Sequence, residues 1–195
     1  MHFIKKAGIQ LFVLILLATT ASCAQENKSN PSDIDNKEEE RVESEAVNDP
    51  SGIEWVSLEE AQKQAKDQGK MVLIFGYADW CPYCMQMRKE TYTNENVRER
   101  LYKYFLPVQL DAESEEEVVF NGETYKSWEF AQFVQLASFP THYFVNKDGE
   151  IIGAQPGFLP SDVFAPLLSY IGTEKFGEIG FEEYLKETEN VVIEQ

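Results

Sequence analysis

Residues 71–91 read Met71-Val-Leu-Ile-Phe-Gly-Tyr-Ala-Asp-Trp-Cys-Pro-Tyr-Cys-Met-Gln-Met-Arg-Lys-Glu-Thr91. The first five residues are all apolar, a pattern typical of a strand that is buried on both faces. A helical pattern begins at Pro82, and proline suits the first position of a helix. The segment therefore predicts a buried strand that leads directly into a helix, with Cys81 and Cys84 at the junction.

The spacing of the two cysteines predicts a redox-active pair. Residues three apart share one face of a helix, so the sulfurs of Cys81 and Cys84 can meet in a small disulfide. Cys81 falls at the start of the helix, where unpaired backbone N–H groups and the helix dipole favour a thiolate. We expect Cys81 to lie at the surface and attack first, and Cys84, one turn further in, to resolve the mixed disulfide.

Other uses of the two thiols stay open at this point. One is a structural disulfide, although so short a loop would stabilise the fold only weakly. A closed zinc site needs about four ligands, and apart from Cys23 the soft ligands are Cys81, Cys84 and His142. Copper capture by both thiols and His142 is a further alternative, as is a redox-inert adaptor that binds peptides with the same face. We favour thiol chemistry without a metal or another cofactor.

Strand and helix patterns alternate on both sides of the cysteines and predict one α/β domain over residues 51–195. We expect a central mixed β-sheet flanked by helices. Asn121-Gly122 lies between two short runs of strand-forming residues and predicts a β-hairpin insert. The expected helices span 57–68, 82–91, 94–104, 128–137 and 161–171, the last capped by Ser161, and the expected strands lie within 71–75, 105–110, 118–125 and 141–152.

Three short motifs resemble those of thioredoxin-fold proteins. They are Ala78-Asp-Trp-Cys-Pro-Tyr-Cys84 at the active site, Ser138-Phe-Pro-Thr141 at the cis-proline loop, and Gly157 as the late glycine. The resemblance covers about residues 53–186 and is strongest to exported SoxW-type thioredoxin-like thiol–disulfide oxidoreductases of bacteria. It implies a thioredoxin fold in which the hairpin insert precedes the cis-proline loop.

The resemblance also implies roles for individual residues. Cys81 corresponds to the nucleophile and Cys84 to the resolving thiol. The Phe139–Pro140 peptide bond is implied to be cis and to lie beside the cysteines. Trp80, Phe139 and Pro140 are implied to form the surface that binds the substrate.

The sequence departs from ordinary thioredoxins at several of these positions. Those proteins carry a buried Asp six residues before the first cysteine, where this chain has Phe75, so the carboxylate that helps to deprotonate the resolving thiol is missing. The residues between the cysteines are Pro-Tyr, as in glutaredoxins, and Met85 replaces the usual Lys. Phe139 is bulky where small or β-branched residues are common, which predicts a different substrate groove.

The first 22 residues have the features of a bacterial lipoprotein signal peptide. Lys5 and Lys6 precede an apolar run at residues 11–18, and Ala21-Ser-Cys23 resembles a lipobox. The apolar run is shorter than the roughly 20 residues needed to span a bilayer. We expect cleavage before Cys23, a lipid anchor on Cys23 and weakly favoured sorting to the outer membrane. The alternative is an ordinary cleaved signal in which Cys23 has no role.

Residues 23–50 are expected to form an acidic, disordered tether. Positions 24–50 hold nine Asp and Glu residues, three Lys and Arg residues and no aromatic residue. Such a segment cannot bury enough apolar surface to fold. The whole chain carries 34 acidic and 17 basic residues, a net charge of −17. This surface repels phosphates, which argues against nucleic acid as a partner.

Together these features predict a thiol–disulfide oxidoreductase that is lipid-anchored in the bacterial cell envelope and faces the periplasm. The resemblance implies that it reduces disulfides of exported proteins. It also implies that a membrane electron donor of the DsbD or CcdA type then restores the dithiol. The direction of transfer depends on the reduction potential of the Cys81–Cys84 pair, and the resemblance favours a reductase over an oxidant.

Overall fold

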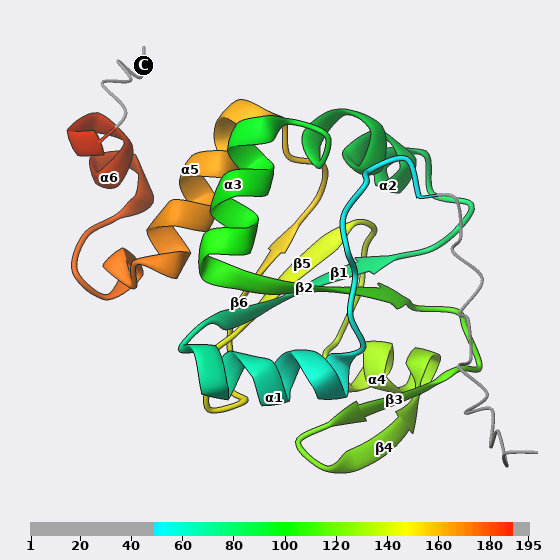
Figure 1. Ribbon diagram of the computed structural model, residues 1–195. Helices are drawn as coiled ribbons and strands as arrows, with labels where there is room; N and C mark the ends of the chain where they lie inside the picture. The colour runs from blue at the N-terminus through cyan, green and yellow to red at the C-terminus, as the bar shows by residue number, and fades with distance from the viewer. Residues whose placement is uncertain (1–48, 189–195) are drawn as a thin grey trace, which may run out of the picture. The chain divides into compact units, whose positions relative to one another are not determined.

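The computed structural model describes residues 49–188 (Figure 1). The predicted signal peptide, the predicted lipid anchor at Cys23 and nearly all of the predicted tether lie outside the described residues. The helices are α1 (Leu58–Gln68), α2 (Pro82–Gln86), η1 (Met87–Thr91), α3 (Glu95–Tyr104), α4 (Ser127–Phe133), α5 (Ser161–Gly172), η2 (Lys175–Gly177) and α6 (Phe181–Thr188). The strands are β1 (Met71–Tyr77), β2 (Phe105–Asp111), β3 (Glu117–Phe120), β4 (Glu123–Lys126), β5 (Thr141–Val145) and β6 (Ile151–Pro156). Within this part of the chain, no helix is both long and apolar enough to cross a membrane.

A four-stranded mixed sheet with the order β2-β1-β5-β6 forms the centre of the domain. Strand β1 pairs in parallel with β2 and antiparallel with β5, and β5 pairs antiparallel with β6. In this register Phe75 lies between Gln109 of β2 and His142 of β5. The central position of β1 explains why its sequence is continuously apolar, since both of its faces are covered.

The side chains of β1 alternate between two apolar clusters, one on each face of the sheet. Val72 and Ile74 pack with residues of α1 and α4. Leu73 and Phe75 pack with residues of α2, α3 and α5. Figure 1 shows these two groups of helices on opposite sides of the sheet. The predicted mixed sheet flanked by helices is therefore confirmed, and the cysteine-bearing helix α2 shares a face with α3 and α5.

Polar side chains fix the starts of two helices as the sequence predicts. Ser57 caps α1 by accepting a hydrogen bond from the N–H of Glu60 at 3.3 Å. At the other end of α1, Gly69 adopts a left-handed conformation with φ of 65°. Asn94 caps α3 by accepting from the N–H of Asn96 at 3.0 Å. These caps satisfy backbone N–H groups that have no partner within the helix.

Strands β3 and β4 form the predicted hairpin insert as a separate two-stranded sheet. Its turn is Asn121-Gly122, with φ of 53° and 85°, as a tight hairpin turn requires. The N–H of Asn121 donates to Oε1 of Gln62 at 3.0 Å, which ties the turn to α1. Figure 1 shows that the hairpin lies on the side of the sheet opposite to α2.

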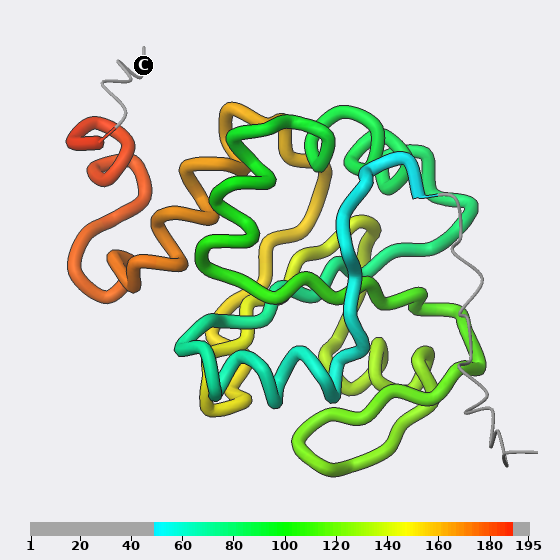
Figure 2. Tube along the Cα trace, in the orientation of Figure 1, coloured from blue at the N-terminus to red at the C-terminus, as the bar shows by residue number. Residues whose placement is uncertain are grey.

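An extended segment over residues 49–57 crosses the domain before α1 begins. Figure 2 shows it running from the neighbourhood of α2 to the start of α1. The N–H of Val56 donates to the carbonyl of Pro107 in β2 at 3.0 Å. Strand β2 is at the edge of the sheet, where a proline, which has no N–H to donate, is tolerated.

Two helix boundaries differ from those predicted. The helix expected over 128–137 ends at Phe133, because Gln135 adopts a left-handed φ of 56° as the chain turns toward the loop before β5. Ser161 does not cap α5. The extended residue before the helix is Pro160, so Ser161 is already the first helical residue.

Three further features of the chain go beyond the predicted elements. The helix expected over 82–91 changes at Met87 into the π-helix η1, in which the N–H of Tyr92 donates to the carbonyl of Met87 at 2.9 Å. Strand β6 continues to Pro156, beyond the predicted end at residue 152. A further helix, α6, follows α5 and packs on it through the rings of Tyr170 and Tyr184, whose centroids are 5.3 Å apart.

Candidate active site

The two cysteines lie at the start of α2, just after the end of β1. Cys81 is the N-cap residue of α2 and Pro82 is its first residue, as predicted. The backbone N–H of Cys84 donates to Sγ of Cys81 at 3.2 Å. Both cysteines are free thiols in this structure. The local fold therefore directs a helical N–H at the sulfur that is predicted to attack.

The expected surface position of Cys81 is wrong. Cys81 is only 4% exposed, and Cys84 is 2% exposed. Both belong to the apolar cluster that also contains Phe75 and Met87, because the end of β1 and the first turn of α2 pack against the same core. The two thiols are therefore almost equal in solvent exposure, and exposure alone does not distinguish them.

The surroundings of Cys84 keep it protonated. Burial raises the pKa of the Cys84 thiol to about 12, and its interaction with Cys81 adds to the rise. A backbone hydrogen bond involving Ala78 and the charge of Arg88 act in the opposite direction. At neutral pH Cys84 is thus a thiol that must lose its proton before it can attack. This behaviour is what we expect of a resolving cysteine.

Two exposed aromatic side chains come from residues next to the cysteines in the sequence. Trp80 is 66% exposed and Tyr83 is 58% exposed. The ring of Trp80 meets the ring of Phe139 edge-on with centroids 5.8 Å apart. The indole Nε1 of Trp80 also donates to Oε2 of Glu113 at 2.9 Å, which fixes its direction. The structure therefore brings together Trp80 and Phe139, two of the three residues predicted to bind substrate.

The third of these residues, Pro140, directly precedes β5. The peptide bond between Phe139 and Pro140 is cis, as predicted. Pro140 is buried, whereas Phe139 is half-buried. The carbonyl of Pro140 accepts a hydrogen bond from the N–H of Gly157 at 2.8 Å. Two of the motifs that carry the resemblance, the proline loop and the late glycine, thus contact each other.

His142 does not join the cysteines. It is fully buried in β5, and its Nε2 lies 3.0 Å from the hydroxyl of Tyr92. Burial lowers the pKa of His142 to about 3, so the imidazole is neutral under ordinary conditions. Among residues 49–188, no three His, Cys, Asp or Glu side chains gather closely enough to hold a metal ion. The copper-binding alternative therefore finds no support in the described part of the chain.

Sequence reasoning missed a buried ion pair on the same side of the sheet as the cysteines. Nη1 of Arg88, in η1, lies 3.0 Å from Oδ2 of Asp49, and these side chains are 8% and 10% exposed. Arg88 gave only a weak signal, because its four-residue spacing from Cys84 marks a shared face only in a continuous α-helix, and the helix changes to a π-helix at Met87. Asp49 gave no such signal, since it is one of many acids in the segment predicted as a tether.

Comparison with known protein families identifies a match over most of the described domain. A family model described as a thioredoxin-like domain matches residues 58–172. This range includes both cysteines, the hairpin insert and the cis-proline loop. It ends with α5 and therefore does not include α6.

One similar curated protein is the thiol:disulfide interchange protein DsbD of Actinobacillus pleuropneumoniae serotype 5b. It is 27% identical over 118 residues, which are 59% of this chain and 19% of that protein. The matched region thus spans about a fifth of the length of this relative.

Two solved structures share the architecture. A thioredoxin-fold protein from Helicobacter pylori has a TM-score of 0.57 at 22% identity, over 64% of this chain and 88% of that one. A thioredoxin from Thermus thermophilus has a TM-score of 0.51 at 26% identity, over 64% of this chain and 92% of that one.

Proposed function

Because the chain belongs to the thioredoxin-like domain family and has the predicted thioredoxin fold, we propose that it is a thiol–disulfide oxidoreductase. Cys81 and Cys84 are its redox dithiol. The observation that carries this proposal is the position of Cys81 at the N-cap of α2, with the N–H of Cys84 donating to its sulfur at 3.2 Å. This N–H faces the atom that holds negative charge when Cys81 attacks and when it leaves.

The reaction proceeds in two exchanges. The Cys81 thiolate attacks one sulfur of a substrate disulfide, and the other substrate sulfur leaves as a thiolate. Cys84 then loses its proton, and its sulfur attacks Sγ of Cys81 in the mixed disulfide. The bond between Cys81 and the substrate breaks, and a Cys81–Cys84 disulfide forms. Two electrons have passed from the protein to the substrate, which leaves as a dithiol.

We infer that disulfide-containing exported proteins are the substrates. Trp80 and Phe139 offer exposed and half-exposed aromatic surface beside the cysteines, which suits a polypeptide chain better than a small polar molecule. The signal-like sequence that ends at Cys23 supports a position in the cell envelope, lipid-anchored and facing the periplasm. Trapping of the bound partner would identify the substrate directly.

The similarity to part of DsbD supports a partner of the same class. A membrane electron donor of the DsbD or CcdA type would reduce the Cys81–Cys84 disulfide after each cycle. In this arrangement the protein works as a reductase. A reduction potential near −270 mV, the region of reducing thioredoxins, is the expected value, whereas one near −120 mV would make it an oxidant.

Insulin reduction tests the proposal. The mature chain should reduce the disulfides of insulin with dithiothreitol as electron donor, and Cys81→Ser should abolish this activity. Cys84→Ser should accumulate a mixed disulfide with a substrate protein, because attack still occurs but resolution does not. The absence of insulin reduction by the wild type would contradict the proposal, and a stable adduct formed by Cys81→Ser would reverse the two roles.

A further inference from the structure

We propose that Arg88 is a positioning residue for the resolving thiol: a buried cation, shared with Asp49, that stabilises negative charge on Cys84 during the second exchange. This inference rests on the proposed function and extends it. Stabilisation of the charge on Cys84 is thereby assigned to a residue of η1. Strand β1 does not supply it, because its residue on this face is the apolar Phe75.

The guanidinium of Arg88 is enclosed by partners of three kinds. Nη1 pairs with Oδ2 of Asp49 at 3.0 Å, and Nη2 donates to Oε1 of Gln109 at 3.0 Å. The guanidinium carbon lies 4.4 Å from the ring centroid of Tyr77 and 5.3 Å from that of Phe75. A buried charge is costly unless it is paired and hydrogen-bonded. One counter-ion, one amide and two aromatic rings offset that cost here, so the charge is fixed in place.

This fixed charge lies on the same side of the sheet as the resolving thiol. Arg88 follows Cys84 by four residues, and its guanidinium lies over the ring of Phe75, which belongs to the same apolar cluster as Cys84. Both side chains are buried on the face of the sheet that Phe75 covers. Burial raises the pKa of Cys84, and the charge of Arg88 counteracts that rise. Arg88 therefore favours the form of Cys84 that attacks.

The other titratable groups around Cys84 do not supply a positive charge. Cys81, at the start of α2, raises the pKa of Cys84 further. Tyr92, which follows η1, is fully buried, and burial raises its pKa well above the ordinary value. His142 of β5 is held neutral by burial, which lowers its pKa to about 3. Among these neighbours, Arg88 is the cation.

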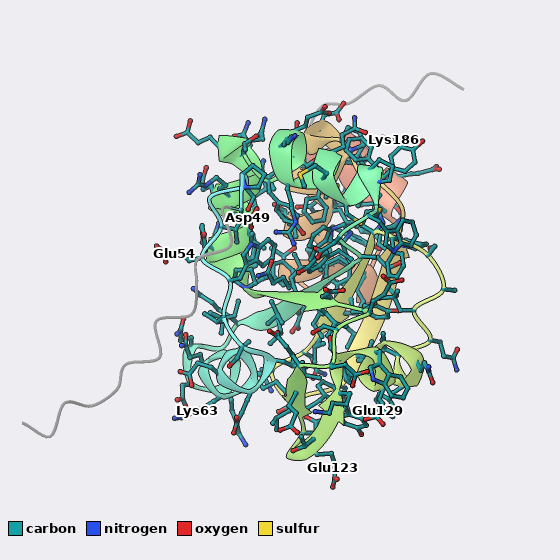
Figure 3. The ribbon with its side chains drawn as sticks, turned by 90° about the vertical axis from the view of Figure 1, so that its right-hand side faces the viewer. Asp49, Glu54, Lys63, Glu123, Glu129 and Lys186 are labelled. Atoms are coloured by element: carbon teal, nitrogen blue, oxygen red, sulfur yellow. The ribbon has the colours of Figure 1, made fainter. Side chains whose placement is uncertain are left out.

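Asp49 is the counter-ion of this charge. Its carboxylate accepts from the N–H of Ser51 at 3.0 Å, from the hydroxyl of Ser51 at 2.7 Å and from Nε1 of Trp55. Burial would raise the pKa of Asp49, but these hydrogen bonds and Arg88 outweigh it, so the pKa is lowered and the group stays ionised. Figure 3 shows Asp49 in the upper half of the domain and Glu123, of the hairpin, at the opposite end.

In the step concerned, Cys84 gives its proton to water and its sulfur forms a bond to Sγ of Cys81. The bond between Cys81 and the partner sulfur breaks, and the electron pair leaves on that sulfur. Arg88 neither gives nor takes a proton. Its charge lowers the energy of the Cys84 thiolate that precedes bond formation.

Stopped-flow reaction of the reduced protein with dithiodipyridine, an uncharged aromatic disulfide, separates the two exchanges. Cys81 releases the first thiopyridone in a phase that depends on reagent concentration. Cys84 releases the second in a phase that does not. Arg88→Met should slow the second phase about threefold for each unit by which the pKa of Cys84 rises, since a more basic thiolate is rarer but more nucleophilic. This slowing of the second phase should persist at every pH below the pKa of Cys84.

Three further variants separate charge from structure. Lys89→Met removes an exposed cation from the adjacent position and should leave both phases unchanged. Arg88→Lys keeps the charge and should restore most of the second-phase rate. Asp49→Asn keeps Arg88 but removes its counter-ion, so the second phase should be as fast as in the wild type or faster. Thermal unfolding confirms that each variant is folded at the assay temperature.

Several outcomes would overturn the inference. An unchanged second phase in Arg88→Met would show that the cation does not act on Cys84. Equal slowing by Arg88→Met, Arg88→Lys and Asp49→Asn would show that the ion pair only supports the fold. A wild type without a second phase would instead contradict the proposed dithiol chemistry itself, so the two failures are distinguishable.

Discussion

The neutral, buried state of His142 makes the stability of the domain sensitive to acid. His142 lies in β5 with its Nε2 3.0 Å from the hydroxyl of Tyr92 and its ring centroid 4.8 Å from that of Phe164. Burial lowers the pKa of His142 from the ordinary 6.5 to about 3. In the unfolded chain the imidazole recovers its ordinary pKa. Below about pH 6.5 the imidazole therefore binds a proton in the unfolded state but not in the folded state. Acid consequently favours unfolding.

The size of this effect follows from the two pKa values. Each pH unit between them removes about 1.4 kcal/mol from the free energy of unfolding. At about pH 5 the loss attributable to His142 should reach about 2 kcal/mol relative to pH 7. Above pH 6.5 the contribution is complete and does not change with pH. The chain has two histidines, and the other is His2 in the predicted signal peptide.

Urea denaturation of the wild type and of His142→Gln at a series of pH values measures this contribution. Glutamine can still hydrogen-bond the Tyr92 hydroxyl but does not titrate. The variant is expected to be less stable at neutral pH. The test is therefore how the difference in free energy of unfolding between the two proteins changes with pH. Carboxylates titrate in both proteins, so their contributions cancel in the difference between the two free energies of unfolding. A difference between the two proteins that stays constant from pH 7 to pH 5 would refute the reasoning.

Three other predictions concern the lipid anchor, the exposed Trp80 and the hairpin. Cys23→Ser should move the protein from the membrane fraction to the soluble periplasmic fraction, and unchanged partitioning would contradict the lipid anchor. Trp80→Ala should raise KM for a protein disulfide while leaving the first phase with dithiodipyridine nearly unchanged, because the exposed indole contacts polypeptide and not the sulfur. Gly122→Ala should lower the free energy of unfolding by about 1–2 kcal/mol, because φ is 85° and a Cβ there meets no atom, so the cost is conformational alone. Gly153→Ala, also without a clash but at an ordinary φ, is the matched control and should change stability little.

The features that sequence predicted well depend on local signals. The run from Met71 to Phe75 is apolar throughout because β1 is central, and a proline after Cys81 marks the first residue of α2. Asn121-Gly122 adopts the positive φ values that its turn requires. In each case the residue type itself restricts the backbone, so neighbours in the sequence carry the information.

The features that sequence did not predict depend on distant contacts. Arg88 and Asp49 are 39 positions apart, and only the path of residues 49–57 across the domain brings them together. The burial of Cys81 depends on packing between α2 and the sheet. The change to π-helix at Met87 has no signal of its own in the sequence. Each of these follows from tertiary packing, which single residues do not specify.

The crossing segment before α1 also covers part of an edge of the sheet. An edge strand with free N–H and C=O groups is a template on which another chain can add a strand and start aggregation. At the β2 edge, Pro107 has no N–H to offer, and its carbonyl already accepts from Val56. The exported proteins proposed as substrates would bring other polypeptide chains to this domain in every cycle. The contact between Val56 and Pro107 therefore leaves fewer free backbone groups on this edge for another chain to pair with.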